Sequence, residues 1–94
     1  MNAGRTRVDP RLQQQLRLSE HAANLTRLCQ RVEMLRRNSE RRFGLHLRAA
    51  LMAYDQTLAL AAVELGICVP GKVPWEAADR LTVEAELSLA GLRW

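Results

Sequence analysis

The chain has 94 residues, enough for one domain with a small core, since a domain of this size buries only roughly 60 to 68% of the surface that its unfolded chain exposes. Nearly half of the residues are hydrophobic but only four are aromatic, and sixteen Leu and thirteen Ala predominate, a composition typical of packed helices rather than strands. The uncharged stretch 56–63 is far shorter than the ~20 residues of a membrane span, and no apolar segment follows the first arginines, so we expect a soluble protein without a secretory signal.

A long first helix is predicted over residues 9–37, after a flexible N-terminus at 1–8. Asp9 is a good N-cap, and Pro10 supplies the fixed φ that suits a first turn. Apolar residues then recur at alternating spacings of three and four, which is the pattern of a seam that packs against another helix. The residues of this first seam are Leu18, Leu25, Leu28, Val32 and Leu35.

A second helix is predicted over 39–66, with Ser39 as its cap and Gly66 as its end. The second seam consists of Phe43, Leu47, Leu51, Tyr54, Leu58 and Leu65. Because the two seams have similar lengths, a turn at Asn38 and Ser39 would fold them into an antiparallel hairpin. The alternative is one unbroken helix whose seam pairs with a second chain, since no proline interrupts the junction.

A connection at 67–74 and a third, shorter helix at 75–91 complete the predicted fold. The letters CVPGKVP contain two prolines and a glycine, which cannot continue a helix, and Pro74 suits the first turn of the next one. This helix is apolar on two sides. Trp75, Ala78, Leu81, Ala85, Leu89 and Leu92 recur at helical spacing, whereas Val83, Leu87 and Ala90 lie on a different side. Two apolar faces on one helix require two neighbours, so we expect a homodimer of an all-α fold.

Arginines gather at the predicted hairpin turn, in the segment RRNSERRFGLHLR at 36–48. Residues 1–48 hold eleven Arg against four acids, a charge of +7, whereas 49–94 hold three basic and six acidic residues, a charge of −3. Helical geometry places Arg37, Arg41 and Arg48 on one side, where they can contact an anionic partner. Phe43 belongs to the seam and is not free to stack on a base, so we expect the cluster to frame the helix junction and to act on acidic protein surface.

The sequence shows no pattern that carries chemistry. Cys29 and Cys68 are expected to be reduced thiols, and with His21 and His46 they lack the close spacing of a zinc site. No phosphate loop or nucleophile motif occurs, so we predict no cofactor, no metal and no small-molecule substrate. The leading hypothesis is a cytoplasmic, non-enzymatic interaction module that acts through its Leu/Ala seams, including Val83 and Leu87 of the third helix. The alternatives are a nucleic-acid-associated protein that uses the basic first half and, behind it, a helical enzyme assembled across a dimer.

Overall fold

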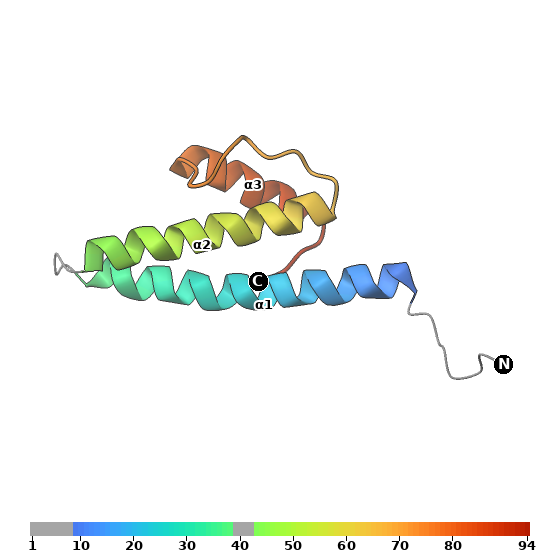
Figure 1. Cartoon of the computed structure of the whole chain (residues 1–94), viewed down its shortest axis with the longest axis horizontal. Helices are drawn as coiled ribbons and strands as arrows, with labels where there is room; N and C mark the ends of the chain where they lie inside the picture. Colours follow the sequence, from blue (N-terminus) through green and yellow to red (C-terminus); the bar gives the residue numbers. More distant parts are fainter. Residues whose placement is uncertain (1–8, 39–42) are drawn as a thin grey trace.

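A computed structural model describes residues 9–38 and 43–94, and these residues form three helices (Figure 1). The first, α1, covers Pro10–Arg37; α2 covers Phe43–Glu64; and α3 covers Ala77–Leu89. About three quarters of the described residues are helical and none of them belongs to a strand, so the predicted all-α class is confirmed.

Helix α1 begins as the sequence predicts. The Asp9 carboxylate accepts a hydrogen bond from the backbone N–H of Arg11 at 2.9 Å, and Pro10 occupies the first turn. Its end is at Arg37, with Asn38 in an extended conformation as the C-cap. The expected flexible segment 1–8 lies outside the described residues.

Helices α1 and α2 lie antiparallel along each other, which confirms the hairpin and makes the alternative of one unbroken helix wrong (Figure 1). Two apolar clusters hold them together. Near the connection, Val32 and Leu35 of α1 pack against Ala50 of α2, and the larger cluster around Leu25 and Leu58 fills the other half of the hairpin. Ser39, the expected cap of the second helix, lies outside the described residues.

The predicted glycine stop at Gly66 is found, and a second glycine ends α3. At the end of α2, Gly66 has a φ of 71°, and the N–H of Ile67 reaches back to the Ala62 carbonyl oxygen at 2.8 Å. Gly91, with a φ of 101°, ends α3 in the same way, with Leu92 bonding back to Leu87 at 3.0 Å. Positive φ is cheap for glycine, so these two residues close the last turns without strain.

Helix α3 begins at Ala77 rather than at the predicted residue 75, so Pro74 does not lie in its first turn. The backbone of Trp75 makes other hydrogen bonds: its N–H donates to the Asp55 carboxylate of α2, and its carbonyl oxygen accepts from Arg80. These bonds hold Trp75 in the connection as an anchor, and Glu76 takes the N-cap position instead.

The two apolar faces predicted for α3 have different environments. Val83 and Leu87 are buried against the hairpin, at 1% and 0% exposure. The other stripe is split: Trp75 and Leu92, which lie beyond the ends of α3, are buried, while Leu81 and Leu89 are 66% and 89% exposed. Leu81 and Leu89 on this face of α3 are therefore left largely uncovered by the described residues.

We expect truncation of the core residue Leu58 to Ala to lower the free energy of unfolding by about 2 to 5 kcal/mol, because a side chain with 0% exposure leaves a cavity that its neighbours cannot fill. Urea denaturation followed by circular dichroism measures the change. The matched control is Leu12→Ala on α1, where the side chain is 48% exposed and the loss should stay near about 0.5 kcal/mol. Equal losses in the two variants would contradict the packing described above.

Candidate functional site

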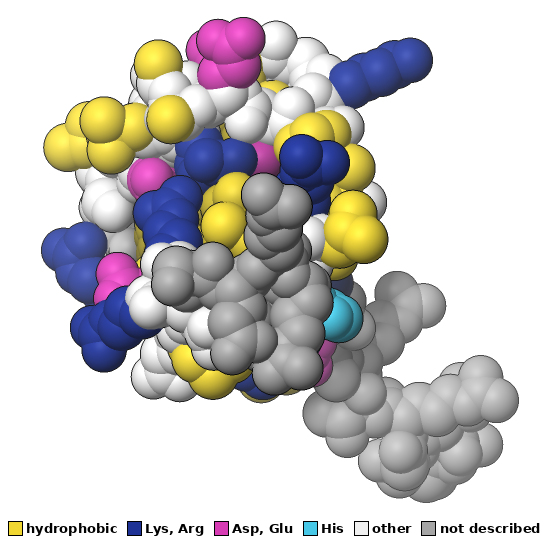
Figure 2. Space-filling model, turned by 90° about the vertical axis from the view of Figure 1, so that its left-hand side faces the viewer, with side chains coloured by type: hydrophobic (Ala, Val, Ile, Leu, Met, Phe, Trp, Pro, Cys, Tyr) yellow, Lys and Arg dark blue, Asp and Glu magenta, His cyan; other side chains and the backbone are white. Residues whose placement is uncertain are grey.

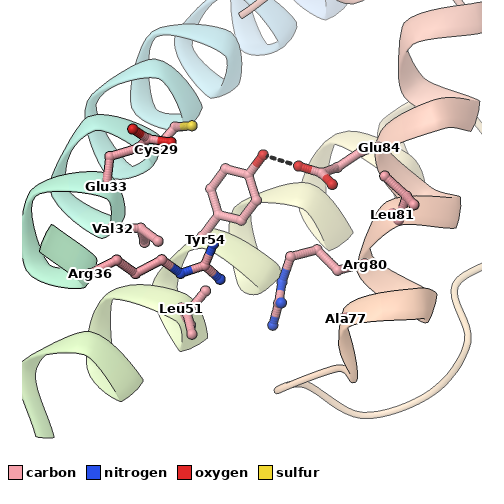
Figure 3. Close-up of a pocket in the computed structure, with 10 residues that line it drawn as sticks. All are labelled: Cys29, Val32, Glu33, Arg36, Leu51, Tyr54, Ala77, Arg80, Leu81 and Glu84. Carbon is pink, nitrogen blue, oxygen red and sulfur yellow. Dashed lines mark hydrogen bonds between the residues drawn. The ribbon is translucent and has the colours of Figure 1, made fainter. Parts of the chain in front are cut away.

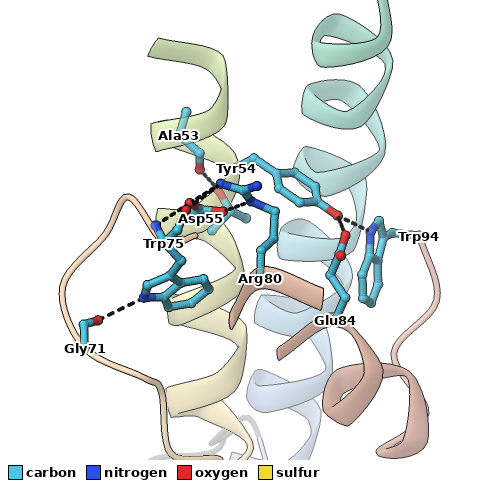
Figure 4. A network of polar contacts seen from close by, with 9 residues as sticks. Ala53, Tyr54, Asp55, Gly71, Trp75, Arg80, Glu84 and Trp94 are labelled. Atoms are coloured by element: carbon cyan, nitrogen blue, oxygen red, sulfur yellow. Dashed lines mark hydrogen bonds and ion pairs between the residues drawn. The ribbon is translucent and has the colours of Figure 1, made fainter. Parts of the chain in front are cut away.

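The strongest polar interaction of the fold is centred on Asp55, a fully buried carboxylate in the middle of α2 (Figure 4). Its Oδ1 accepts from Nε of Arg80 at 2.5 Å, and its Oδ2 accepts from Nη2 of the same guanidinium at 2.9 Å. The backbone N–H of Trp75 adds a third donor to Oδ2 at 2.9 Å. Both carboxylate oxygens are thus satisfied, as burial of a charge requires.

Arg80 links three parts of the chain at once. Besides Asp55 it donates to the carbonyl oxygen of Trp75 at 3.0 Å, and its side chain is only 13% exposed. The carboxylate of Asp55 raises the pKa of the guanidinium above its ordinary value, so the charge is permanent at any physiological pH. The indole N–H of Trp75 donates to the Gly71 carbonyl oxygen at 2.9 Å. This bond holds the connection between α2 and α3 close to Trp75, which is itself bound to the hairpin.

A second group of contacts surrounds Tyr54, the neighbour of Asp55 in sequence. The phenol donates to Oε2 of Glu84 at 2.5 Å, and the indole N–H of Trp94 donates to the phenol oxygen at 3.1 Å (Figure 4). Burial is the main reason that the pKa of Tyr54 lies well above its usual range, and the bond to the Glu84 carboxylate raises it further. The two groups together attach α3 and the C-terminus to the hairpin.

A pocket of about 310 Å³ opens beside Tyr54, where α1, α2 and α3 meet (Figure 3). The Tyr54 ring projects from α2 into the space between the other two helices, and apolar side chains such as Val32, Leu51 and Leu81 surround it. The charged residues of the lining are Glu33 and Arg36 from α1 and Arg80 and Glu84 from α3. An apolar site of this size with a few charged groups has the character of a small ligand site.

The far end of the hairpin is tied by a surface ion pair. Nη2 of Arg17 lies 2.6 Å from Oε1 of Glu64, and Gln14 donates to the Glu64 carbonyl oxygen at 2.8 Å. The Arg17 guanidinium lowers the pKa of the Glu64 carboxyl. Because both groups are partly exposed, this pair sets the register of the helix ends more than it adds stability.

The structure buries or half-buries the predicted seam residues whose side chains it describes. Leu25, Leu28, Val32, Leu35, Tyr54, Leu58, Val83 and Leu87 are buried, and Leu18, Leu47, Leu51 and Leu65 are partly buried. The side chain of Phe43 lies outside the described residues. The predicted seams are therefore used within the chain, to pack the three helices on one another.

Two of the three arginines proposed to meet an anionic partner lie within the described residues. Arg37 is exposed and lies 3.4 Å from Glu33, Arg48 is exposed, and Arg41 lies outside the described residues. Figure 2 views the end of the molecule near the α1–α2 connection, and there the Lys and Arg side chains stand at several separate places with acidic and apolar groups between them. Arg36, next in sequence to Arg37, instead lines the pocket.

Helix periodicity does not predict the Asp55–Arg80 pair, because the two residues are 25 positions apart and lie on different helices. One signal was present in the sequence. Asp55 is the only charged residue between Arg48 and Glu64, and Arg80 is the only arginine between Arg48 and Arg93. A lone acid in an apolar helix needs a cation when it is buried, and a lone arginine in the acidic half is a suitable candidate.

The described residues hold no group of three His, Cys, Asp or Glu side chains that could bind a metal ion. In the same part of the chain, no helix is both long and apolar enough to cross a membrane. Cys29 and Cys68 are exposed thiols.

Comparison with protein-family models, with curated proteins and with solved structures finds no match for this chain.

Replacement of Asp55 by Ala should lower the free energy of unfolding by about 3 to 5 kcal/mol, because the guanidinium of Arg80 then stays buried without a counter-charge. Chemical denaturation measures the loss. A double variant, Asp55→Leu with Arg80→Leu, removes both charges and should unfold at a free energy closer to that of the wild type. A double variant as unstable as Asp55→Ala would show that the ion pair is not the source of the effect.

Tyr54 should resist ionisation at alkaline pH. It is the chain's single tyrosine, so the rise in absorbance at 295 nm that accompanies tyrosinate formation reports on it alone. Since its folded pKa is raised above the unfolded value of about 10, the folded protein should remain largely un-ionised one pH unit above that value. By linkage, the stabilisation is fully present below pH ~10 and is lost as the pH rises toward the folded pKa. A midpoint near 10 in the folded protein would contradict the burial of this phenol.

Proposed function

We propose that this protein is a non-enzymatic helical interaction module, and that its partner surface is the outward face of α2. One observation carries the proposal. Leu45, Leu60 and Val63 project from the side of α2 that faces away from α1, and they are 75%, 57% and 70% exposed. Large apolar side chains that gather on one helix face mark an interaction site more often than a solvated surface.

The outward face of α2 has the spacing of a helical seam. Leu45, Ala49, Met52, Gln56, Leu60 and Val63 follow one another at intervals of three or four residues, so they form one stripe along the helix. The charged residues of α2 are Arg48, Asp55 and Glu64, and none belongs to this stripe. Asp55 and Glu64 are also neutralised within the chain, by Arg80 and Arg17.

A second copy of the chain is the partner that fits this stripe best. When two α2 helices pair antiparallel about a point between Met52 and Gln56, Leu45 of each copy lies opposite Val63 of the other. Such a contact is self-complementary, as a two-fold dimer requires. It also brings together surfaces without charge, so the net charge of +4 on each copy opposes it little.

We further propose that the module works in the cytoplasm, because Cys29 and Cys68 are exposed thiols that a reducing compartment keeps free. Its role would be that of an adaptor, a regulator or an assembly subunit. The nucleic-acid alternative gains less support, since at the end of the molecule seen in Figure 2 the described Lys and Arg side chains stand apart, with acidic groups between them.

Substitution of Leu60 by Glu should convert a dimer at micromolar concentration into a monomer, because a carboxylate that is buried in an apolar contact loses its hydration. Light scattering combined with size-exclusion chromatography measures the mass. The matched control is Leu16→Glu on α1, which adds the same charge at a leucine of nearly equal exposure, 55% against 57%, and should remain a dimer.

The outcomes separate the candidate partners. A monomeric wild type that co-purifies with another protein, and loses it in Leu60→Glu but not in Leu16→Glu, would assign the stripe to that protein instead of a second copy. A monomer that captures no protein would contradict the proposal. Sub-micromolar binding to random duplex at about 150 mM salt, which falls steeply when the salt is raised, would favour the nucleic-acid alternative.

A further inference from the structure

The pocket between the three helices contains both signs of charge beside an apolar floor (Figure 3). Of its four charged residues, Arg80 is already committed, because its guanidinium is bound by both oxygens of Asp55. The remaining three are Arg36 of α1, Glu84 of α3, and Glu33 of α1, which is exposed and forms a surface pair with Arg37. A molecule in the pocket thus meets one cation and two carboxylates.

The cation has no counter-charge of its own. Among the described residues, no carboxylate forms an ion pair with Arg36, whereas the adjacent Arg37 is paired with Glu33 at 3.4 Å. A guanidinium presents parallel N–H donors that match the two oxygens of a carboxylate. Arg36 is therefore suited to hold a carboxylate at the α1 wall of the pocket.

The opposite wall offers an acceptor for a positive group. Oε2 of Glu84 accepts the phenol of Tyr54, and within the described part of the chain its second oxygen accepts no other hydrogen bond. Tyr54 also holds this carboxylate in place, since the phenol is itself fixed by Trp94. Glu33 adds a second negative charge to the same pocket.

Much of the remaining lining of the pocket is apolar. The Tyr54 ring, with 4% exposure of the residue, forms the floor, and the side chains of Leu51 and Leu81 stand beside it. A volume of about 310 Å³ is at the lower end of the range for ligand pockets, which suits a compact molecule rather than an extended one.

We propose that this pocket binds a free α-amino acid with a large apolar side chain. Arg36 takes its carboxylate, Glu84 takes its ammonium group, and the side chain lies on Tyr54 and Leu51. Each simpler ligand leaves part of the lining unsatisfied. An acid without the amine faces the two glutamates, an amine without the acid faces Arg36, and a neutral apolar molecule removes water from all three charges without replacing it.

The test uses L-phenylalanine and L-leucine as probes, titrated to millimolar concentration into ¹⁵N-labelled protein and followed by amide chemical shifts. At least one of them should shift the signals of residues that line the pocket. Two analogues of L-phenylalanine, 3-phenylpropionate without the amine and phenethylamine without the carboxylate, should bind roughly tenfold more weakly or worse, since each lacks one charge-assisted contact.

Matched variants locate the two contacts. Arg36→Gln should weaken binding by roughly tenfold, whereas Arg31→Gln removes the same charge from an exposed site on α1 outside the pocket and should have little effect. Glu84→Gln keeps an acceptor for Tyr54 but loses the charge, and its control is the exposed Glu86→Gln. Circular dichroism establishes that each variant is folded.

The proposal is overturned if neither amino acid shifts pocket signals, if the single-charge analogues bind as well as the amino acid, or if each control weakens binding as much as its partner variant. The outcome is independent of the proposed partner surface. Leu60→Glu lies on the other side of α2 and should bind the amino acid like the wild type, so failure of one proposal leaves the other standing.

Discussion

The ion pair between Asp55 and Arg80 determines where the third helix lies. A fully buried carboxylate is costly unless every lone pair is used, and here three N–H groups converge on it from the same short stretch of chain. Two of these donors belong to Arg80 in the first turns of α3, and the third is the backbone of Trp75 just before the helix. Because all three must meet one carboxylate, the start of α3 has little freedom to move or rotate.

The Asp55–Arg80 ion pair also explains which face of α3 is buried. Periodicity alone offers two apolar stripes, one with Val83 and Leu87 and another with Leu81 and Leu89, and it cannot choose between them. Once Arg80 points to Asp55, Val83 and Leu87 turn toward the hairpin core, and Leu81 and Leu89 turn outward. A short helix with two similar apolar faces is oriented by its polar contacts, although its apolar contacts supply most of the stabilisation.

The α1–α2 hairpin, by contrast, could be predicted from the sequence. Its seams are long, regular and closed by local signals, such as the Asp9 cap and the glycine stop at Gly66, each of which depends on neighbouring residues only. The start of α3 and the pocket could not be predicted in this way, because both depend on contacts between residues that are 20 or more positions apart. Local patterns predict elements well, whereas a site built from three helices exists only after they are packed.

Tyr54 connects the core to the candidate ligand site. Its ring is part of the main apolar cluster and also the floor of the pocket, and its hydroxyl joins Glu84 of α3 to Trp94 near the C-terminus. Asp55 follows it directly on α2, so the residue that fixes α3 and the residue that shapes the pocket move as one unit. Since Leu60 and Val63 lie on the other side of this helix, a partner can cover the outward stripe of α2 without closing the pocket. The two proposed recognition surfaces thus lie on different sides of one helix.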